Sequence, residues 1–131
     1  MADLTFSGYP ENCPLPEADD CGGGVFRVTK NDPPSDEDFL SQHELGFVPK
    51  YTPTAARACK ARSLSVYKVI EDARHHVKVF AAHGTYIAAA TLTPDRGKIM
   101  PTPPADGSRP SHCEWWCADG QDRRGGFVIL E

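Results

Sequence analysis

The chain has 131 residues and a mass of 14.3 kDa, which suffices for one domain with its own core and leaves no room for a second. Its formal net charge is −4 at neutral pH, and an acidic protein has no general attraction for nucleic acid or for an anionic membrane. The N-terminal segment lacks the basic and apolar regions of a secretory signal, and no apolar run approaches membrane-spanning length. We therefore expect a cytoplasmic protein.

Residues 1–23 have a composition typical of a flexible arm. They contain three prolines, an acidic cluster at 17–20 and the first two glycines of the triple glycine at 22–24. Such a segment has little apolar surface to bury against a core. We therefore expect a mobile arm over residues 1–23, followed by a single domain over residues 24–131.

The first strand is predicted over residues 25–30, where side chains of alternating character face the two sides of a sheet. Arg27 lies in the middle of this strand, which is an unusual position for a guanidinium group. A loop and then a helix are predicted next, because Ser35 is a good N-cap, three acidic residues follow it, and Gly46 can end the helix.

A short second helix is predicted over residues 54–61, with Thr54 as its cap. It carries the strongest basic patch of the chain, formed by Arg57, Lys60 and Arg62. Such a patch is usually a solvated helix face, and contact with a phosphate group is the alternative.

The rest of the chain is predicted to contain four more strands and one more helix. The segments, in order, are a strand at 63–69, a helix from 70 ending at Gly84, a strand at 85–93, a turn into KIM, a Pro-rich loop at 101–111, a strand at 112–117 and a last strand at 127–130. On the helix, His75 and His76 are expected to be solvated or half-buried. The order predicts one small α+β domain with a mixed or mostly antiparallel sheet and two or three helices.

The strand HCEWWC divides its side chains between two faces. His112, Glu114 and Trp116 lie on one face, while the two cysteines and Trp115 lie on the other. The thiol and tryptophan face is expected to join the core, because free cysteine and Trp are mostly buried. The face with His112 and Glu114 is the candidate for chemistry.

The five cysteines bear on redox state and metal binding. They are Cys13, Cys21, Cys59, Cys113 and Cys117. An odd count in a reducing compartment favours free thiols over a disulfide framework. Zinc is the alternative partner for Cys113 and Cys117, with Cys13 and Cys21 available from the arm. Structural zinc sites, however, take thiolates from tight turns about two to four residues apart, so we expect no metal.

Three short motifs occur in a suggestive order along the chain. They are Arg27 on the first strand, Ser63-Leu64-Ser65 at the start of the second, and His112-Cys113-Glu114 on a late strand after a long loop. In this order they resemble the arginine, Ser-Thr-Ser and Glu-x-Glu motifs of the ADP-ribosyltransferase-like superfamily. Leu64 stands where that family has Thr, and His112 where it has Glu or Gln.

The resemblance implies an ADP-ribosyltransferase-like fold that binds NAD, or a related phosphorylated nucleotide, and that transfers ADP-ribose or cleaves NAD. It implies that Glu114 is the catalytic carboxylate and that His112 contacts the ribose or the target. The implied nucleotide-binding residues are Arg27 at the pyrophosphate, Ser63 or Ser65 in support of Glu114, and Tyr67 or Trp116 on the nicotinamide ring. An arginine suits a pyrophosphate because its planar fork pairs bidentately.

The same residues also have an interpretation without catalysis. Arg27 can pair with a carboxylate at the sheet surface, while His112 and Glu114 can form the solvent face of an edge strand. The protein is then an interaction module, antitoxin-like or regulatory, whose Trp-bearing face and acidic arm contact another protein. The enzyme interpretation requires Arg27, Ser65 and Glu114 to converge in one pocket, and it fails if Arg27 and Glu114 lie on opposite faces of the sheet or too far apart to share one ligand.

Overall fold

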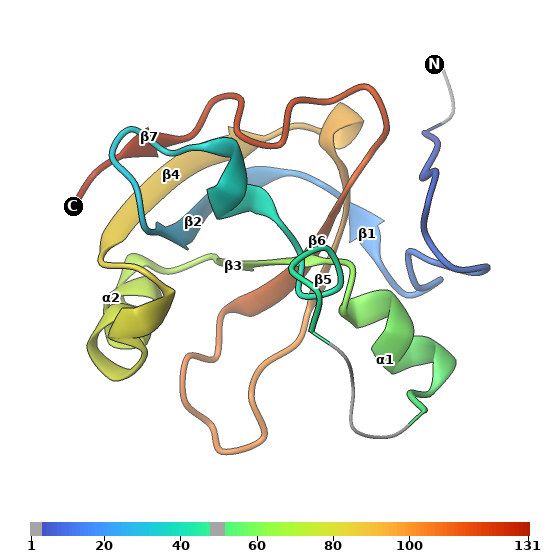
Figure 1. The fold of residues 1–131 in the computed structure, drawn as a ribbon, viewed down its shortest axis with the longest axis horizontal. Helices are drawn as coiled ribbons and strands as arrows, with labels where there is room; N and C mark the ends of the chain where they lie inside the picture. The colour runs from blue at the N-terminus through green and yellow to red at the C-terminus, as the bar shows by residue number, and fades with distance from the viewer. Residues whose placement is uncertain (1–3, 48–51) are drawn as a thin grey trace.

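The structure, a computed structural model, describes residues 4–47 and 52–131 and in these ranges forms one seven-stranded antiparallel sheet (Figure 1). The strands are β1 (Asp19–Asp20), β2 (Gly23–Thr29), β3 (Leu64–Tyr67), β4 (Tyr86–Leu92), β5 (Gly97–Pro101), β6 (His112–Cys117) and β7 (Val128–Ile129). Their order across the sheet is β1-β5-β6-β3-β2-β4-β7. With the helices α1 (Ala55–Lys60) and α2 (Ile70–Val79), this confirms the predicted small α+β domain. No described helix is both long enough and apolar enough to span a membrane.

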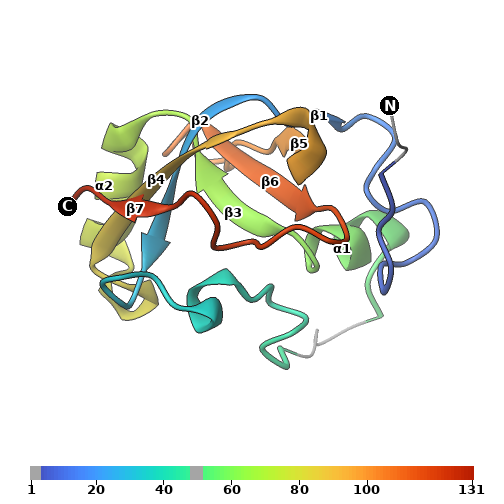
Figure 2. The same cartoon turned by 90° about the horizontal axis from the view of Figure 1, so that it is seen from above.

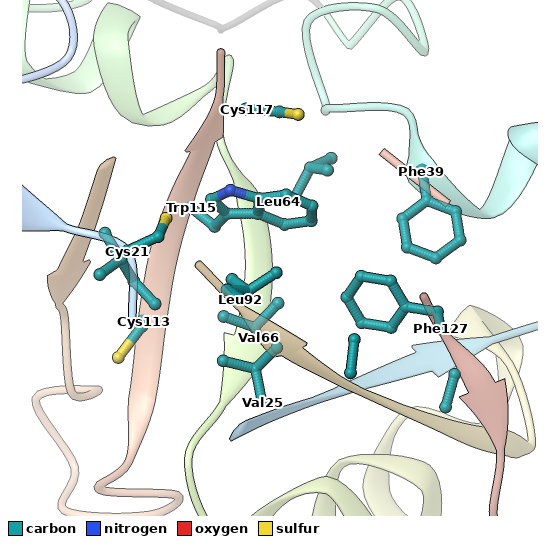
Figure 3. Close-up of a cluster of buried hydrophobic side chains, with 13 residues drawn as sticks. Cys21, Val25, Phe39, Leu64, Val66, Leu92, Cys113, Trp115, Cys117 and Phe127 are labelled. Carbon is teal, nitrogen blue, oxygen red and sulfur yellow. The ribbon is translucent and has the colours of Figure 1, made fainter. Parts of the chain in front are cut away.

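One face of the sheet carries the larger hydrophobic core. Trp115 is completely buried there and packs at 5.9 Å from the ring of Phe127, which in turn lies 4.9 Å from Phe39. Figure 3 shows these rings beside the aliphatic side chains of β2, β3 and β4. Cys113 and Cys117 belong to the same cluster, so the predicted division of HCEWWC into a core face and a second face is confirmed.

The opposite face is covered by the two helices. α2 packs over β2, β3 and β4 through a cluster centred on Tyr67, Ala73 and Ile87. α1 covers Trp116, whose indole N–H donates to the carbonyl of Cys59 at 2.9 Å. α1 precedes β3 and α2 follows it, so the two helices lie near opposite ends of that strand (Figures 1 and 2).

The helix predicted from Ser35 to Gly46 is wrong. Only a 3₁₀ turn, Asp36–Phe39, forms, and a separate turn begins after Ser41. A continued helix would need the carbonyls of Asp38 and Phe39, but Arg27 donates to the first at 2.8 Å and Arg123 to the second at 2.9 Å. Two arginines distant in sequence therefore bind carbonyls that a longer helix would use for its own hydrogen bonds.

Each of the two turns is also closed by its own side chain. The carboxylate of Asp38 accepts from the backbone N–H of Ser35 at 2.9 Å and of Lys30 at 2.8 Å. Glu44 accepts from the backbone of Ser41 at 2.9 Å. Such local side-chain hydrogen bonds compete with helix formation. Elsewhere the helix boundaries differ less: Thr54 caps α1 as predicted, while α2 ends at Val79 and a 3₁₀ turn fills the interval to Gly84.

The segment expected to be a mobile arm lies along the domain from residue 4 onward. A disulfide joins Cys13 to Cys59 in α1, with Cα atoms 5.4 Å apart. β1 pairs with β5, and the hydroxyl of Tyr9 donates to the carbonyl of Cys117 at 3.2 Å. The expectation of free thiols is therefore wrong for Cys13 and Cys59, although Cys21, Cys113 and Cys117 are free and buried.

Candidate functional site

A polar pocket of about 270 Å³ opens on the helix-bearing face of the sheet, beside α1. Its polar lining is formed by Gln42, Arg57, Lys60, Ser63, Ser65 and Glu114. Three of these residues, Ser63, Ser65 and Glu114, come from the motifs that the sequence singles out. The pocket therefore combines a carboxylate, two hydroxyls and two cations.

The pairing of β3 with β6 explains why the motif residues meet. Ser65 lies directly opposite Glu114, and Tyr67 lies opposite His112. Cross-strand neighbours in an antiparallel pair share one face of the sheet. Two segments nearly fifty residues apart thus place a hydroxyl, an imidazole and a carboxylate side by side.

Hydrogen bonds connect these groups through Thr102, just after β5. The Thr102 hydroxyl donates to Glu114 Oε2 at 3.1 Å, and the Thr102 carbonyl lies 2.9 Å from His112 Nδ1. On its other side, His112 Nε2 lies 3.1 Å from the hydroxyl of Ser65. The remaining distance, between His112 Nδ1 and Glu114 Oε2, is 4.0 Å. The imidazole is therefore held in one orientation between Ser65 and Thr102.

Glu114 is the most enclosed charged group of the pocket, with 14% of its side chain exposed. Burial raises its pKa above the ordinary value, while His112 and the hydrogen bond from Thr102 act in the opposite direction. Because burial is the largest of these influences, the neutral form of Glu114 is favoured more than in an exposed glutamate. Such groups are characteristic of catalytic sites.

The rim of the pocket is positively charged. Arg57 and Lys60 lie one turn apart on α1, and both side chains are exposed. Lys60 is close enough to Glu114 to lower the pKa of that carboxyl. The third member of the predicted basic patch, Arg62, instead donates to the carbonyl of Ala58 at 2.7 Å. Two of the three cations are thus available to an anionic ligand.

Arg27 lies on the opposite face of the sheet from Glu114. Register places Phe26 beside Tyr67, and Tyr67 beside His112, so the neighbouring Arg27 points to the other side. Its guanidinium donates to the carbonyls of Asp38 at 2.8 Å and Ser65 at 2.7 Å. Burial lowers the pKa of Arg27 to about 10, so it stays charged at neutral pH.

Arg27, Ser65 and Glu114 do not converge in one pocket, so the arrangement that the ADP-ribosyltransferase-like interpretation requires is not found. Ser65 and Glu114 share the pocket, whereas Arg27 reaches only the backbone behind Ser65. An arginine bonded in this way fixes the position of β3. A phosphate group in the pocket would meet Arg57 and Lys60 instead.

The aromatic residues proposed to stack on a nicotinamide ring are both buried. Trp116 is completely enclosed beneath α1, and Tyr67 is 2% exposed. The Tyr67 hydroxyl lies 2.6 Å from His76 Nδ1, and its ring meets His112 edge-on at 5.4 Å between centroids. Among the described residues, no aromatic ring lines the pocket. The lining therefore suits the phosphates and ribose of a nucleotide but supplies no stacking surface for its base.

Three parts of the site, namely Thr102, Gln42 and the position of α1, are not predicted from the sequence. Thr102 and Gln42 lie in segments without a motif. α1 lies beside the pocket, with the carbonyl of Cys59 bonded to Trp116 of the sheet and its thiol joined to Cys13. The basic spacing of α1 was the one signal visible in the sequence. Within the described ranges, no cluster of three or more His, Cys, Asp or Glu side chains is placed to hold a metal ion.

Comparisons with protein-family models, with curated proteins and with solved structures find no match to this chain. The fold and site define a small α+β domain with a polar, cation-rimmed pocket on one face of an antiparallel sheet. Functional conclusions therefore depend on the residues of that pocket.

Proposed function

We propose that the protein binds a phosphorylated nucleotide, with NAD as the substrate, in the pocket beside α1 and cleaves its nicotinamide glycosidic bond. The proposal rests on the pocket residues alone, because the arrangement of Arg27, Ser65 and Glu114 that the motif resemblance requires is not found. The observation that carries the proposal is the enclosure of Glu114 in a pocket whose rim bears Arg57 and Lys60. Two cations suit a pyrophosphate, and a half-desolvated carboxylate suits the positive charge that develops on a ribose.

Glu114 has two tasks in this reaction. As the bond between ribose C1′ and the nicotinamide nitrogen breaks, nicotinamide leaves with the electron pair and positive charge develops on the ribose. The carboxylate stabilises that charge and accepts a proton from the water that adds to C1′. The products are nicotinamide, ADP-ribose and one proton.

The other pocket residues position the substrate. The exposed hydroxyl of Ser65 lines the same pocket as Glu114, where it can bond to a ribose hydroxyl. Ser63 Oγ donates to the carbonyl of Lys60 at 2.7 Å, which fixes the end of α1. In this proposal Arg57 and Lys60, and not Arg27, bind the phosphates.

The proposal is tested by measuring the release of nicotinamide from NAD by chromatography, for the native chain and for the Glu114→Gln variant. The proposal expects release by the native chain and a loss of about 100-fold or more in the variant. Glu71→Gln is a matched control, because Glu71 is an exposed carboxylate on α2. Absence of release by the native chain, with no shift of its melting temperature by NAD, would contradict the proposal.

An interaction module is the second candidate, and one feature at the edge of the sheet favours it. β7 is the last strand in the described order, and Val128 and Leu130 are 59% and 53% exposed. An edge strand with exposed apolar side chains suits an extended segment of another protein that adds as a further strand. The Trp-bearing face proposed from the sequence has no such role, because Trp115 and Trp116 are buried.

A further inference from the structure

The pair formed by Ser65 and His112 has the geometry of a nucleophile and its base. Ser65 is exposed and lines the pocket, and its hydroxyl lies 3.1 Å from His112 Nε2. This distance is within the hydrogen-bonding range in which a base can take the proton of a nucleophile.

The protons of this network are fixed by the carbonyl of Thr102. Both oxygens of Thr102 lie 2.9 Å from His112 Nδ1. The carbonyl oxygen only accepts, and the hydroxyl donates its single hydrogen to Glu114 Oε2, so we assign the hydrogen to Nδ1. In the neutral ring Nε2 is then the acceptor, and it faces the hydroxyl of Ser65. Ser65 therefore donates to the imidazole, which is the direction of proton transfer that activation of a serine requires.

Glu114 completes the arrangement as a third member. Its Oε2 lies 4.0 Å from His112 Nδ1 and accepts from the hydroxyl of Thr102 at 3.1 Å. When the imidazole takes a second proton, this nearby carboxylate stabilises the resulting positive charge. The same network that orients the ring thus supports its charged form.

Ser63 provides an internal contrast. It is 8% exposed, and its hydroxyl donates to the carbonyl of Lys60 at 2.7 Å. Its hydrogen is therefore engaged in ending α1. Of the two serines in the motif, Ser65 alone is both accessible and paired with an imidazole.

We infer that Ser65 is a nucleophile activated by His112, and that the pocket takes an acyl group from an ester whose acid or alcohol part carries a negative charge. The charge preference follows from Arg57 and Lys60 on the rim. This activity does not depend on the cleavage of NAD.

The reaction balances with water as the second substrate. Ser65 Oγ bonds to the acyl carbon while its proton passes to His112 Nε2, and the bond to the alcohol oxygen breaks as the alcohol takes that proton. Water then attacks the acyl-serine, gives its proton to His112, and releases the carboxylic acid while the serine oxygen recovers the proton.

The test uses a fluorophosphonate, which phosphonylates activated serines, followed by intact mass and peptide mapping of the full chain. We expect one adduct, on Ser65, that is absent from Ser65→Ala. Its rate of formation should fall by about 100-fold or more in His112→Gln. Ser108→Ala, a substitution in the loop between β5 and β6, is the control and should label at the native rate.

Folding of each variant is checked by its thermal unfolding, and His112→Asn serves as a second variant if His112→Gln does not fold. Labelling of the native chain is also a test by itself. Absence of an adduct on Ser65, or labelling of several serines, would overturn the inference. Equal labelling of Ser65 in a folded His112 variant would overturn it as well. Release of nicotinamide from NAD is measured separately and tests only the glycosidic cleavage.

Discussion

Arg27 donates a hydrogen bond of 2.7 Å to the backbone carbonyl of Ser65. It does so from the face of the sheet opposite to the pocket. The same guanidinium bonds to Asp38 and lies 5.3 Å from the ring centroid of Phe39. It thus joins β3 to the 3₁₀ turn Asp36–Phe39. A residue that the motif order assigns to the ligand instead positions the strand that carries Ser65.

Arg27→Met should therefore reduce stability much more than it reduces ligand binding. The substitution removes two charge-assisted hydrogen bonds, to the carbonyls of Asp38 and Ser65, which should lower the free energy of unfolding by about 2–4 kcal/mol. Urea unfolding measures this change. Arg124→Met is the control, because Arg124 forms an exposed pair with Asp36 at 3.5 Å, and should change stability by less than about 1 kcal/mol. Unchanged stability in Arg27→Met with lost nucleotide binding would contradict this assignment.

Lys60→Gln should weaken nucleotide binding without destabilising the fold. The exposed ammonium group on the pocket rim pairs with phosphate charge, so its loss should raise the dissociation constant for ADP by about 10-fold at low salt. The difference between native and variant should shrink as salt is added. Calorimetric titration with ADP measures it, with Lys78→Gln, an exposed position on α2, as control. Equal affinities for the two variants would exclude Lys60 from the site.

The Cys13–Cys59 disulfide should stabilise the chain and hold α1 in place. Its sequence separation is 46 residues, for which loop-closure entropy gives about 4 kcal/mol. Reductant should therefore lower the melting temperature of the native chain. The variant with both cysteines replaced by Ser should start at the lower temperature and should not respond to reductant. An intact mass without the loss of two hydrogens would show that the bond does not form.

His76 should make stability depend on pH below neutrality. Burial first, then the neighbouring His83 and Arg109, lower its pKa from 6.5 to about 4. The folded state therefore binds fewer protons than the unfolded state between these values, so stability is full above pH 6.5 and is lost as the pH falls toward 4.

The size of this effect is on the order of 1 kcal/mol, because the ring is only half-buried and solvent screens it. Urea unfolding between neutral pH and pH 4 measures the loss. This loss of stability should be smaller in His76→Gln. In His75→Gln it should equal the loss in the native chain, since His75 is exposed on the same helix. A native profile that is flat in this range would contradict the assignment.

Local pattern in the sequence predicts the strands well, because alternation reports directly on the two faces of a sheet. β6 begins and ends at the predicted residues, His112 and Cys117, and its core face is the predicted one. The helix expected after Ser35 fails because Arg27 and Arg123 take its carbonyls. Those contacts depend on the fold and leave no local signal.

The candidate site is predicted only in part for the same reason. Ser65, His112 and Glu114 could be chosen from their motifs, and strand pairing brings them together. Thr102, which fixes the proton on His112, lies just after β5 and has no motif of its own. The position of α1 depends on the disulfide and on Trp116, which neither helix propensity nor charge spacing reveals.

The most direct test of nucleotide binding at the pocket is a titration of the ¹⁵N-labelled chain with NAD, in which the amide chemical shifts are measured. We predict that the shifts change together at α1, at Ser63 and Ser65, and at His112 and Glu114, with one dissociation constant. The amides of β7 should not respond. Absence of any change, or changes confined to β7, would contradict the binding of a nucleotide in this pocket.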